Sequence, residues 1–580
     1  MKEDPITFAV VYNGFKAIVD EMNLALFRSA FSPVITEGRD IGGAVFDSSG
    51  NLIAQGQWDL AVFIGLLEYS LKAIVGIYKD NIEDGDIFIA NDPFVGGTHF
   101  NDVGIVRPVF AGGKLIAFVA VCGHWADVGG QEPGSLVANA REHFQEGVRI
   151  PPIKLVMAGK PNTAVYELIS ANMRLPNDRM ADLKAQVGAT QLGESRLLDM
   201  VKKFGLEKVE GTMEESIAYS ERLLRSEISQ MPKGEYEGDD YVDMESRERP
   251  YPKHVHVKLT VAEDHLTFDF TGSDSESLSS ANSTLSSTAS AVLVTVKSLF
   301  PEIPINHGCF TPIEIVAPEH TVVNAKPPRA ISSMAATVYE KVVGACQAAL
   351  AQVIPEKAVA CQYNLINLTL GGDYRGTPYV AYMYSEGGFG GRATKDGPAG
   401  LVSLYGGGAK ITPVEVFERR YPMEFEEWAL WPDSGGPGEF RGGVGSRKTF
   451  RLTEGEARLS CLGDREVYPA FGIFGGKSGA KHGLVRNEGQ PDEENLTLKA
   501  SGVELKAGDR ITVKAGGGGG YGNPLDRDPS LVLHDVRMGY VGTEGAKSEY
   551  GVVIDQNLHI DITATELLRK AMQENPSSAY

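Results

Sequence analysis

Two long apolar runs joined by a short glycine turn restrict the architecture of this chain more than any other segment. Residues 102–110 and 115–122 flank Ala111-Gly112-Gly113-Lys114. The glycine pair is typical of a tight turn, so the segment predicts a β-hairpin. If the turn is centred between its two glycines, Asp102 lies opposite Gly123, because antiparallel strands pair symmetrically about the turn.

The same register brings several metal-ligand side chains to the open end of the hairpin. His124 follows directly after the predicted partner of Asp102, and His99 is expected opposite Ala126. A slip of one residue would turn alternate side chains to the other face of the sheet. The sequence therefore predicts that these groups are close together more firmly than it predicts their pairing.

His99, Asp102 and His124 together predict a metal site. Two imidazoles and a carboxylate, with a position left for water, are a common catalytic ligand set for divalent zinc, manganese or iron. Asp40 follows Glu37-Gly38-Arg39 at the open end of another predicted hairpin and offers a further carboxylate. The alternative is a pair of histidines whose hydrogen bonds are satisfied within glycine-rich turns.

Length and periodicity predict a multidomain α+β protein. The chain has 580 residues, of which 42% are hydrophobic and 23% are charged, and it exceeds the size of one compact core. We expect mixed sheets, helices and a glycine-rich, β-rich C-terminal part. The predicted units are a metal-binding N-terminal region (1–160), a helical segment (161–232), a central α/β region (233–410), a glycine-rich β region (411–523) and a small C-terminal unit (524–580).

Charge and composition exclude several classes of partner. The net charge of −21 argues against nucleic acid, whose phosphates require clustered Lys and Arg. No signal-type pattern follows Met1, and we expect no apolar run that approaches the roughly 20 residues of a membrane helix. The five cysteines are far apart and form no CxxC motif. We therefore expect a cytoplasmic protein with reduced thiols.

Two further segments carry residues that suit a functional role. Residues 141–152 are polar and charged, and in this segment His143 or Arg149 could face an anionic intermediate; the alternative is a helix end with surface charges. The glycine run 516–522 resembles a phosphate cradle but lacks the Gly-Lys-Ser/Thr ending of a P-loop. We interpret it as a tight structural loop or an interface loop.

Taken in order, several motifs resemble the hydantoinase B/oxoprolinase family. The likeness extends over almost the whole chain, and the first 155 residues carry its most specific strings. These strings are Glu37-Gly38-Arg39-Asp40, Asn91-Asp92-Pro93-Phe94, Gly96-Gly97-Thr98-His99, Asn101-Asp102-Val103, Gly123-His124-Trp125-Ala126-Asp127-Val128-Gly129-Gly130, Gln145-Glu146-Gly147-Val148-Arg149-Ile150-Pro151-Pro152, Asp269-Phe270-Thr271-Gly272-Ser273 and the segment 516–524.

The resemblance implies a subunit of an ATP-dependent hydrolase of cyclic amides such as lactams, hydantoins or oxoproline. It implies a partner subunit of hydantoinase A type, which uses ATP and Mg²⁺ to phosphorylate the substrate, and a heteromer of the two. The ligands of relatives fall on His99, Asp102 and His124, with Asp40 as an addition and zinc as the first expectation. Metal-bound water would then attack the activated carbon.

A hypothesis of mechanism assigns roles around the metal. Asp127 or Asp92 is expected as a general base or as a group that orients a ligand imidazole, and His143 and Arg149 are expected to stabilise charge on the departing phosphate. His143 departs from the family pattern, where relatives usually carry an aliphatic or aromatic residue. Two alternatives stay open: a subunit of an ATP-dependent ketone carboxylase of the acetone or acetophenone type, and a non-catalytic scaffold with a structural metal.

Overall fold

The structure is a computed structural model that describes residues 4–244 and 250–574; the remaining residues of the predicted N-terminal, central and C-terminal units lie outside the described residues. Helices and strands are interleaved along this part of the chain, and the strands gather in four separate sheets. The predicted α+β class is confirmed. The boundaries between the five predicted units stay predictions.

The N-terminal sheet is antiparallel and contains the predicted hairpin at its centre. Its strand order is β2-β1-β5-β4-β3-β6-β7. Both faces are covered, so β5 is buried along nearly its whole length. The strands are β1 Ile41–Asp47, β2 Leu52–Gln55, β3 Ile87–Ala90, β4 Asp102–Ala111, β5 Lys114–His124, β6 Ile153–Met157 and β7 Lys160–Pro161.

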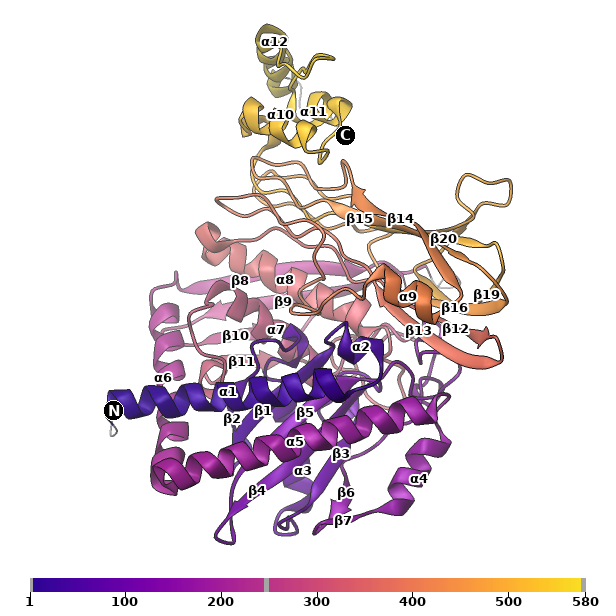
Figure 1. The fold of residues 1–580 in the computed structure, drawn as a ribbon. Coiled ribbons are helices and arrows are strands. Elements are labelled where there is room, and N and C mark those ends of the chain that lie inside the picture. Colours follow the sequence, from indigo (N-terminus) through magenta and orange to yellow (C-terminus); the bar gives the residue numbers. More distant parts are fainter. Residues whose placement is uncertain (1–3, 245–249, 575–580) are drawn as a thin grey trace.

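Two long helices cover one face of this sheet (Figure 1). The helix α1, Pro5–Ser29, begins where the Asp4 carboxylate accepts a hydrogen bond from the Thr7 N–H at 3.1 Å. The helix α5, Pro176–Phe204, lies alongside it, and α6, Leu206–Ser229, follows. These two helices are separated at Gly205, whose φ of 87° lies outside the helical range.

The opposite face carries α3, which corrects one expectation from the sequence. Ala61–Tyr78 has a mean hydropathy of 1.6 and, by length and composition, could cross a membrane, so the expectation that no such run exists is wrong. Only Leu66–Tyr78 is α-helical, and Leu71 and Ile74 are buried in the core. A helix of 13 residues is about 20 Å long, shorter than the roughly 30 Å hydrocarbon core. The segment is a core helix of this fold.

The central sheet packs against two apolar helices. Its order is β11-β10-β9-β8, and α8 lies on β8 and β9 while also contacting α7. One continuous core joins this sheet to the inner face of the N-terminal sheet. The elements are β8 Gly234–Val242, β9 Lys253–Val261, β10 Leu266–Asp269, β11 Ile313–Val316, α7 Leu285–Leu299 and α8 Val338–Val353.

Two further sheets enclose a separate core in the C-terminal part. One has the order β13-β12-β16-β19 and the other β14-β15-β20-β17-β18. Their strands are β12 Asn367–Tyr374, β13 Thr377–Tyr384, β14 Met423–Trp431, β15 Gly445–Leu452, β16 Glu456–Leu462, β17 Gly483–Arg486, β18 Glu494–Leu496, β19 Lys499–Lys506 and β20 Arg510–Ala515.

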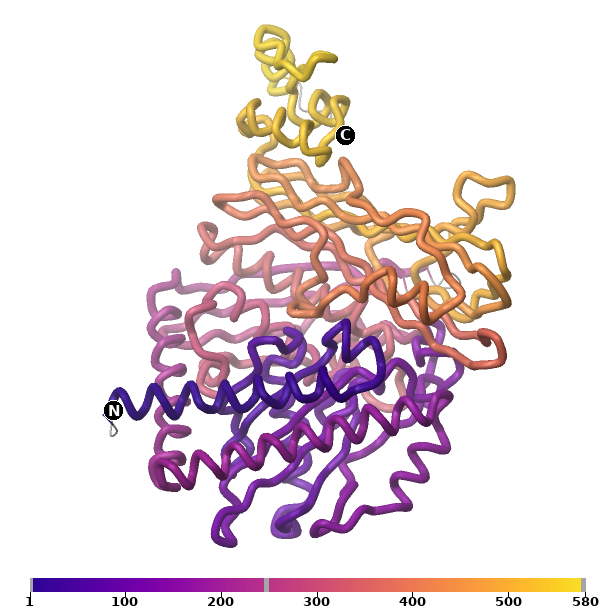
Figure 2. The backbone as a smooth tube through the Cα atoms, in the orientation of Figure 1, coloured from indigo at the N-terminus to yellow at the C-terminus, as the bar shows by residue number. Residues whose placement is uncertain are grey.

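The glycine run 516–522, which follows β20, packs its backbone against the backbone of neighbouring loops. A Cβ on Gly518 would lie 2.2 Å from the Phe389 carbonyl, and one on Gly520 would lie 2.0 Å from the Pro437 oxygen. The glycines therefore permit close approach of neighbouring loops, in line with a structural loop. Beyond them stands the small unit α10–α12 at one end of the molecule (Figure 2).

The elements not yet named are short helices and turns, together with the three helices of the small unit. They are α2 Pro33–Thr36, η1 Ala61–Phe63, η2 Pro93–Val95, η3 His143–Gln145, α4 Thr163–Ala171, η4 His307–Cys309, η5 Met334–Ala336, η6 Pro355–Lys357, α9 Val414–Arg420, η7 Pro524–Asp526, α10 Pro529–Arg537, α11 Thr543–Tyr550 and α12 Ile562–Glu574.

Candidate metal centre

The hairpin of β4 and β5 pairs with a register that differs by one residue from the predicted one. Asp102 lies opposite His124, not opposite Gly123. The cause is a bulge opposite Val109 and Phe110, where Val109 pairs with Ala117 and Phe110 with Leu115; the additional residue, Ile116, lies in β5 and shifts every pair beyond it. The ladder ends at Asp102, so His99 lies in the preceding bend and not in a pair with Ala126.

The bulge brings the three predicted ligands into one buried group. The Asp102 carboxylate lies between the two imidazoles: its Oδ2 is 2.9 Å from His99 Nδ1, and its Oδ1 is 3.0 Å from His124 Nδ1. The imidazole centroids are 5.0 Å apart, and the donor atoms of all three residues lie within 4.8 Å of one another. None of the three is more than 4% exposed. The Thr98 hydroxyl also donates to Asp102 Oδ2.

The charges of this group suit a cation. Burial opposes the ionisation of Asp102, but the two imidazoles outweigh burial and hold the pKa of that carboxyl well below its usual range. Burial lowers the pKa of His124, which favours the neutral imidazole that metals bind. The Nε2 atom of His124 is buried and has no hydrogen-bond partner within the described chain. A buried ring nitrogen without a partner fits a site that binds a ligand, so these residues could hold a divalent metal.

Asp40 lies beside this group but outside the set whose donor atoms are mutually within 4.8 Å. Its backbone carbonyl accepts a hydrogen bond from the His124 N–H at 3.0 Å. Burial and the neighbouring charge of Asp102 raise the pKa of Asp40 well above its usual range. Asp40 is therefore placed next to the candidate centre, and its role as a ligand stays a prediction.

Tyrosines that the sequence analysis missed form the other wall of the centre. The Tyr382 ring lies 4.7 Å from the His124 ring and 5.9 Å from the Tyr384 ring, and both tyrosines come from β13. Tyr405, from the loop after β13, lies near Asp102 and Asp40 and is also buried. The spacing of Tyr382 and Tyr384 shows that they share a face of a strand. Nothing in the sequence indicates which distant element that face meets.

Asp127 is fully buried, and its carboxylate is engaged in holding a loop. Its Oδ1 accepts a hydrogen bond from Gly129 N–H at 3.0 Å, and its Oδ2 accepts hydrogen bonds from Gly134 N–H at 2.8 Å and from Arg174 at 3.0 Å. These donors account for both oxygens. The geometry thus assigns Asp127 a positioning role in the loop after β5, and its predicted role as general base stays untested.

His143 and Arg149 lie together around Phe94. The His143 ring is 5.7 Å from the Phe94 ring, and the Arg149 guanidinium is 5.3 Å from its centroid. Arg149 donates to Asp92 at 2.6 Å and is about one third exposed, whereas His143 is buried and its Nδ1 has no hydrogen-bond partner among the described residues. Burial and the charge of Arg149 lower the pKa of His143. These two residues form a group separate from the three ligands.

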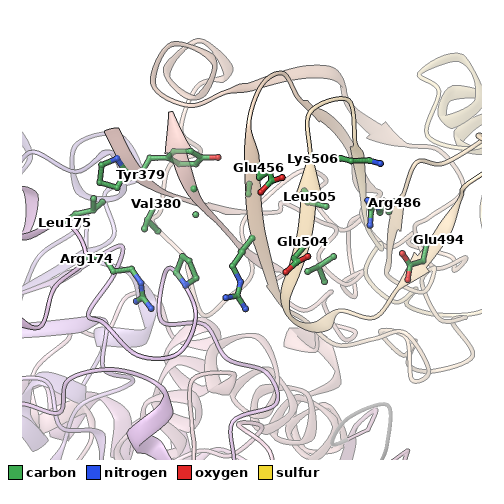
Figure 3. A pocket seen from close by; sticks show the side chains of 17 residues that line it. Arg174, Leu175, Tyr379, Val380, Glu456, Arg486, Glu494, Glu504, Leu505 and Lys506 are labelled. Carbon is green, nitrogen blue, oxygen red and sulfur yellow. The ribbon is translucent and has the colours of Figure 1, made fainter. Parts of the chain in front are cut away.

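A cleft leads from the surface toward the ligand group. Its outer part, a cavity of about 1110 Å³, lies between the loop of Arg174 and the sheet of β12, β16 and β19 (Figure 3). A second hollow of about 460 Å³ shares Leu175, Tyr379 and Val380 with the first and is also lined by Ala126 and Tyr382. The inner hollow therefore reaches the tyrosine that contacts His124.

Comparison with known proteins extends this picture. The family model described as hydantoinase B/oxoprolinase matches residues 4–524. The caprolactamase subunit beta of Pseudomonas jessenii is 31% identical over 98% of this chain and 99% of its own length. The protein 5-oxoprolinase 1 of Arabidopsis thaliana is 28% identical over 90% of this chain, which corresponds to 42% of that longer protein.

Two solved structures share the fold. The crystal structure of ATP-dependent caprolactamase from Pseudomonas jessenii matches with a TM-score of 0.91 and 29% identity, covering 98% of this chain and 100% of the other. A nucleotide-free structure of acetone carboxylase matches with a TM-score of 0.92, covering 100% of this chain and 84% of the other. The identity to that second structure is 20%, so it is evidence for the fold alone.

Proposed function

Because the chain belongs to the hydantoinase B/oxoprolinase family, we propose that it is the metal-binding subunit of an ATP-dependent hydrolase of cyclic amides. The observation that carries the proposal is the buried group of His99, Asp102 and His124 at the open end of the β4–β5 hairpin. Relatives named as caprolactamase and 5-oxoprolinase support a cyclic amide as the substrate class.

In this proposal His99, Asp102 and His124 hold a divalent cation, with Asp40 as a further ligand. The mixed nitrogen and oxygen donors favour zinc, with manganese and iron as alternatives. When bound, the metal supplies a Lewis acid that lowers the pKa of water from about 15.7 toward 7. Asp102 orients both imidazoles, and Tyr382 closes one side of the centre against bulk water.

The partner is proposed from the chemistry of the substrate. An unstrained amide is a poor electrophile, which gives a reason to spend ATP on phosphorylating its oxygen. This sequence contains no P-loop, so we assign that step, with its ATP and Mg²⁺, to a separate subunit of hydantoinase A type in a heteromer. A relative named as a subunit beta, and a related structure described as ATP-dependent, support this division of labour.

We propose that the activated substrate reaches the centre through the cleft. The inner hollow is lined by Ala126 and Tyr382 and is large enough for a small ring. Arg149 and His143 are proposed to receive the phosphate that departs; the exposed guanidinium and the unpartnered Nδ1 of the imidazole support that role. Asp127 is proposed to keep its loop in place beside the hollow.

The experiment is a turnover assay on the chain co-purified with its ATP-using partner. Release of ADP is followed with lactams, hydantoins and 5-oxoproline, with and without bicarbonate. ADP release that depends on the cyclic amide and yields a ring-opened product without bicarbonate is the expected result. Turnover that requires bicarbonate and gives a carboxylated product would replace the proposal with the carboxylase function.

A further inference from the structure

A second group of histidines lies on the central sheet, away from the hairpin. His254 and His256 alternate along β9, so their side chains share one face of the strand. The neighbouring strand β8 places Asp239 directly opposite His256 and Tyr241 opposite His254. Residues paired in this way have Cβ atoms about 4.5–5.5 Å apart, close enough for their side chains to converge.

The three side chains converge on one carboxylate oxygen. Asp239 Oδ1 lies 2.6 Å from His254 Nε2 and 2.9 Å from His256 Nδ1. One donor atom from each residue lies within 4.8 Å of the other two. In a tetrahedral zinc site, donor atoms bonded at about 2.0–2.1 Å stand about 3.3 Å apart. The His254 contact would have to lengthen by about 0.7 Å and the His256 contact by about 0.4 Å to reach this separation.

Surrounding residues fix the imidazoles in place. The Tyr241 ring stacks on the His254 ring at 4.8 Å, and Tyr468 stacks on Tyr241 at 5.1 Å. On the other side, Ser273 exchanges two hydrogen bonds with the backbone of His256. Ring stacking and the strand backbone thus limit rotation of the ligands, which reduces the entropy lost on binding a metal.

Gly272 lies close to the imidazole of His256. A Cβ at this position would lie 3.2 Å from His256 Cδ2, and the backbone has a φ of 106° that disfavours other residues. A side chain at this position would therefore crowd the imidazole of His256. His254 is 31% exposed, His256 19% and Asp239 45%, so the group also faces solvent.

We propose that Asp239, His254 and His256 form a second site for a divalent transition-metal ion of the zinc class. Two imidazole nitrogens select against Ca²⁺ and Mg²⁺, which prefer oxygen ligands. Three protein ligands on a solvent-facing sheet leave coordination positions for water or another small ligand. The site links β8 to β9 and, through Tyr241 and Tyr468, reaches the loop after β16 in the C-terminal part.

The test is a count of bound zinc. The full chain is stripped with a chelator, dialysed to equilibrium against micromolar ZnCl₂, and its metal content is measured by mass spectrometry. We expect His254→Ala and His256→Ala each to bind one zinc ion fewer than the wild type. Asp239→Asn is expected to weaken zinc binding at this site at least about tenfold. Replacing even a residue that only hydrogen-bonds to a metal ligand lowers metal affinity by about that factor.

A matched control separates this site from surface histidines in general. His265 lies on the same sheet, in the turn between β9 and β10, beside Asp264 at 3.5 Å and half exposed. His265→Ala should bind as much zinc as the wild type. An unchanged zinc count in the double variant of His254 and His256 would overturn the proposal.

The two proposed sites are separated by a third variant. His124→Ala removes a ligand of the first centre only, and it should still lose one zinc ion when His256→Ala is added. The loss of one zinc ion between His124→Ala and the double variant with His256→Ala is expected whether or not the first centre binds zinc in solution. If adding His256→Ala to His124→Ala changes nothing, the second site does not exist, whatever the result at the first.

Discussion

Replacing Asp102 with asparagine tests the candidate centre with the smallest change of shape. The carboxylate lies between two imidazoles, with one oxygen 2.9 Å from His99 Nδ1 and the other 3.0 Å from His124 Nδ1. Asparagine keeps one acceptor oxygen but replaces the other with an NH₂ group, which cannot accept a hydrogen bond. One imidazole therefore loses its partner, and the group loses its negative charge.

The magnitude follows from the lost hydrogen bond. A hydrogen bond to a charged group contributes about 1.5–3 kcal/mol, so the free energy of unfolding should fall by that amount in metal-free Asp102→Asn. Burial opposes the ionisation of Asp102, but the two imidazoles outweigh burial and lower the pKa of this carboxyl below 3.8. The contribution is therefore present above pH 3.8 and is lost as the pH falls through the lower folded-state pKa.

The assay is thermal unfolding with a chelator and then with added zinc. Zinc should raise the Tm of the wild type, because an ion that binds only the folded state stabilises it. Asp102→Asn should begin from a lower Tm and respond far less. Asp127→Asn is the matched control, since Asp127 is equally buried and accepts three hydrogen bonds from the described chain. It should lose stability but keep the zinc response. A wild-type zinc response in Asp102→Asn would refute the assignment.

Three further predictions concern a buried carboxylate, the glycine loop and the cleft. Burial raises the pKa of Glu146 from 4.5 to about 7, so the cost of burying its ionised carboxylate grows as the pH rises from 4.5 to 7. Glu146→Gln should therefore raise the free energy of unfolding by about 1–3 kcal/mol at pH 8 and leave it unchanged at pH 4. Equal changes in the free energy of unfolding at the two pH values would contradict this prediction. Gly518→Ala should lower the free energy of unfolding by about 3 kcal/mol, because its Cβ would clash with the Phe389 backbone. Gly211→Ala is the control, since a Cβ there meets nothing within 4 Å and should not lower the free energy of unfolding. Denaturant unfolding measures both variants, and equal effects would contradict the packing role of Gly518. Leu175→Trp should narrow the cleft and lower kcat/KM more for bulky than for small rings at unchanged zinc content; equal losses would argue against this route.

Local chemistry made much of the N-terminal part predictable. The glycine pair Gly112-Gly113 correctly placed the turn between β4 and β5. Proximity of His99, Asp102 and His124 followed from that hairpin alone. These features depend on neighbours in the sequence, where periodicity and turn residues carry the information.

Features that depend on distant contacts were not predictable in the same way. The bulge at Val109 and Phe110 has no composition signal, and it changed the partner of Asp102 by one residue. Tyr382 reaches His124 across more than 250 positions of the sequence, through the packing of β13 on the N-terminal part. The approach of Asp239 to His254 and His256 depends in the same way on the register of β8 with β9.

Anomalous diffraction at the zinc edge, on crystals of a preparation with measured turnover, tests the central claim most directly. The account predicts a peak about 2.0–2.2 Å from donor atoms of His99, Asp102 and His124, and its loss together with hydrolysis in His124→Ala. Full hydrolysis by a preparation in which these residues are ordered and no metal peak lies among them would contradict it.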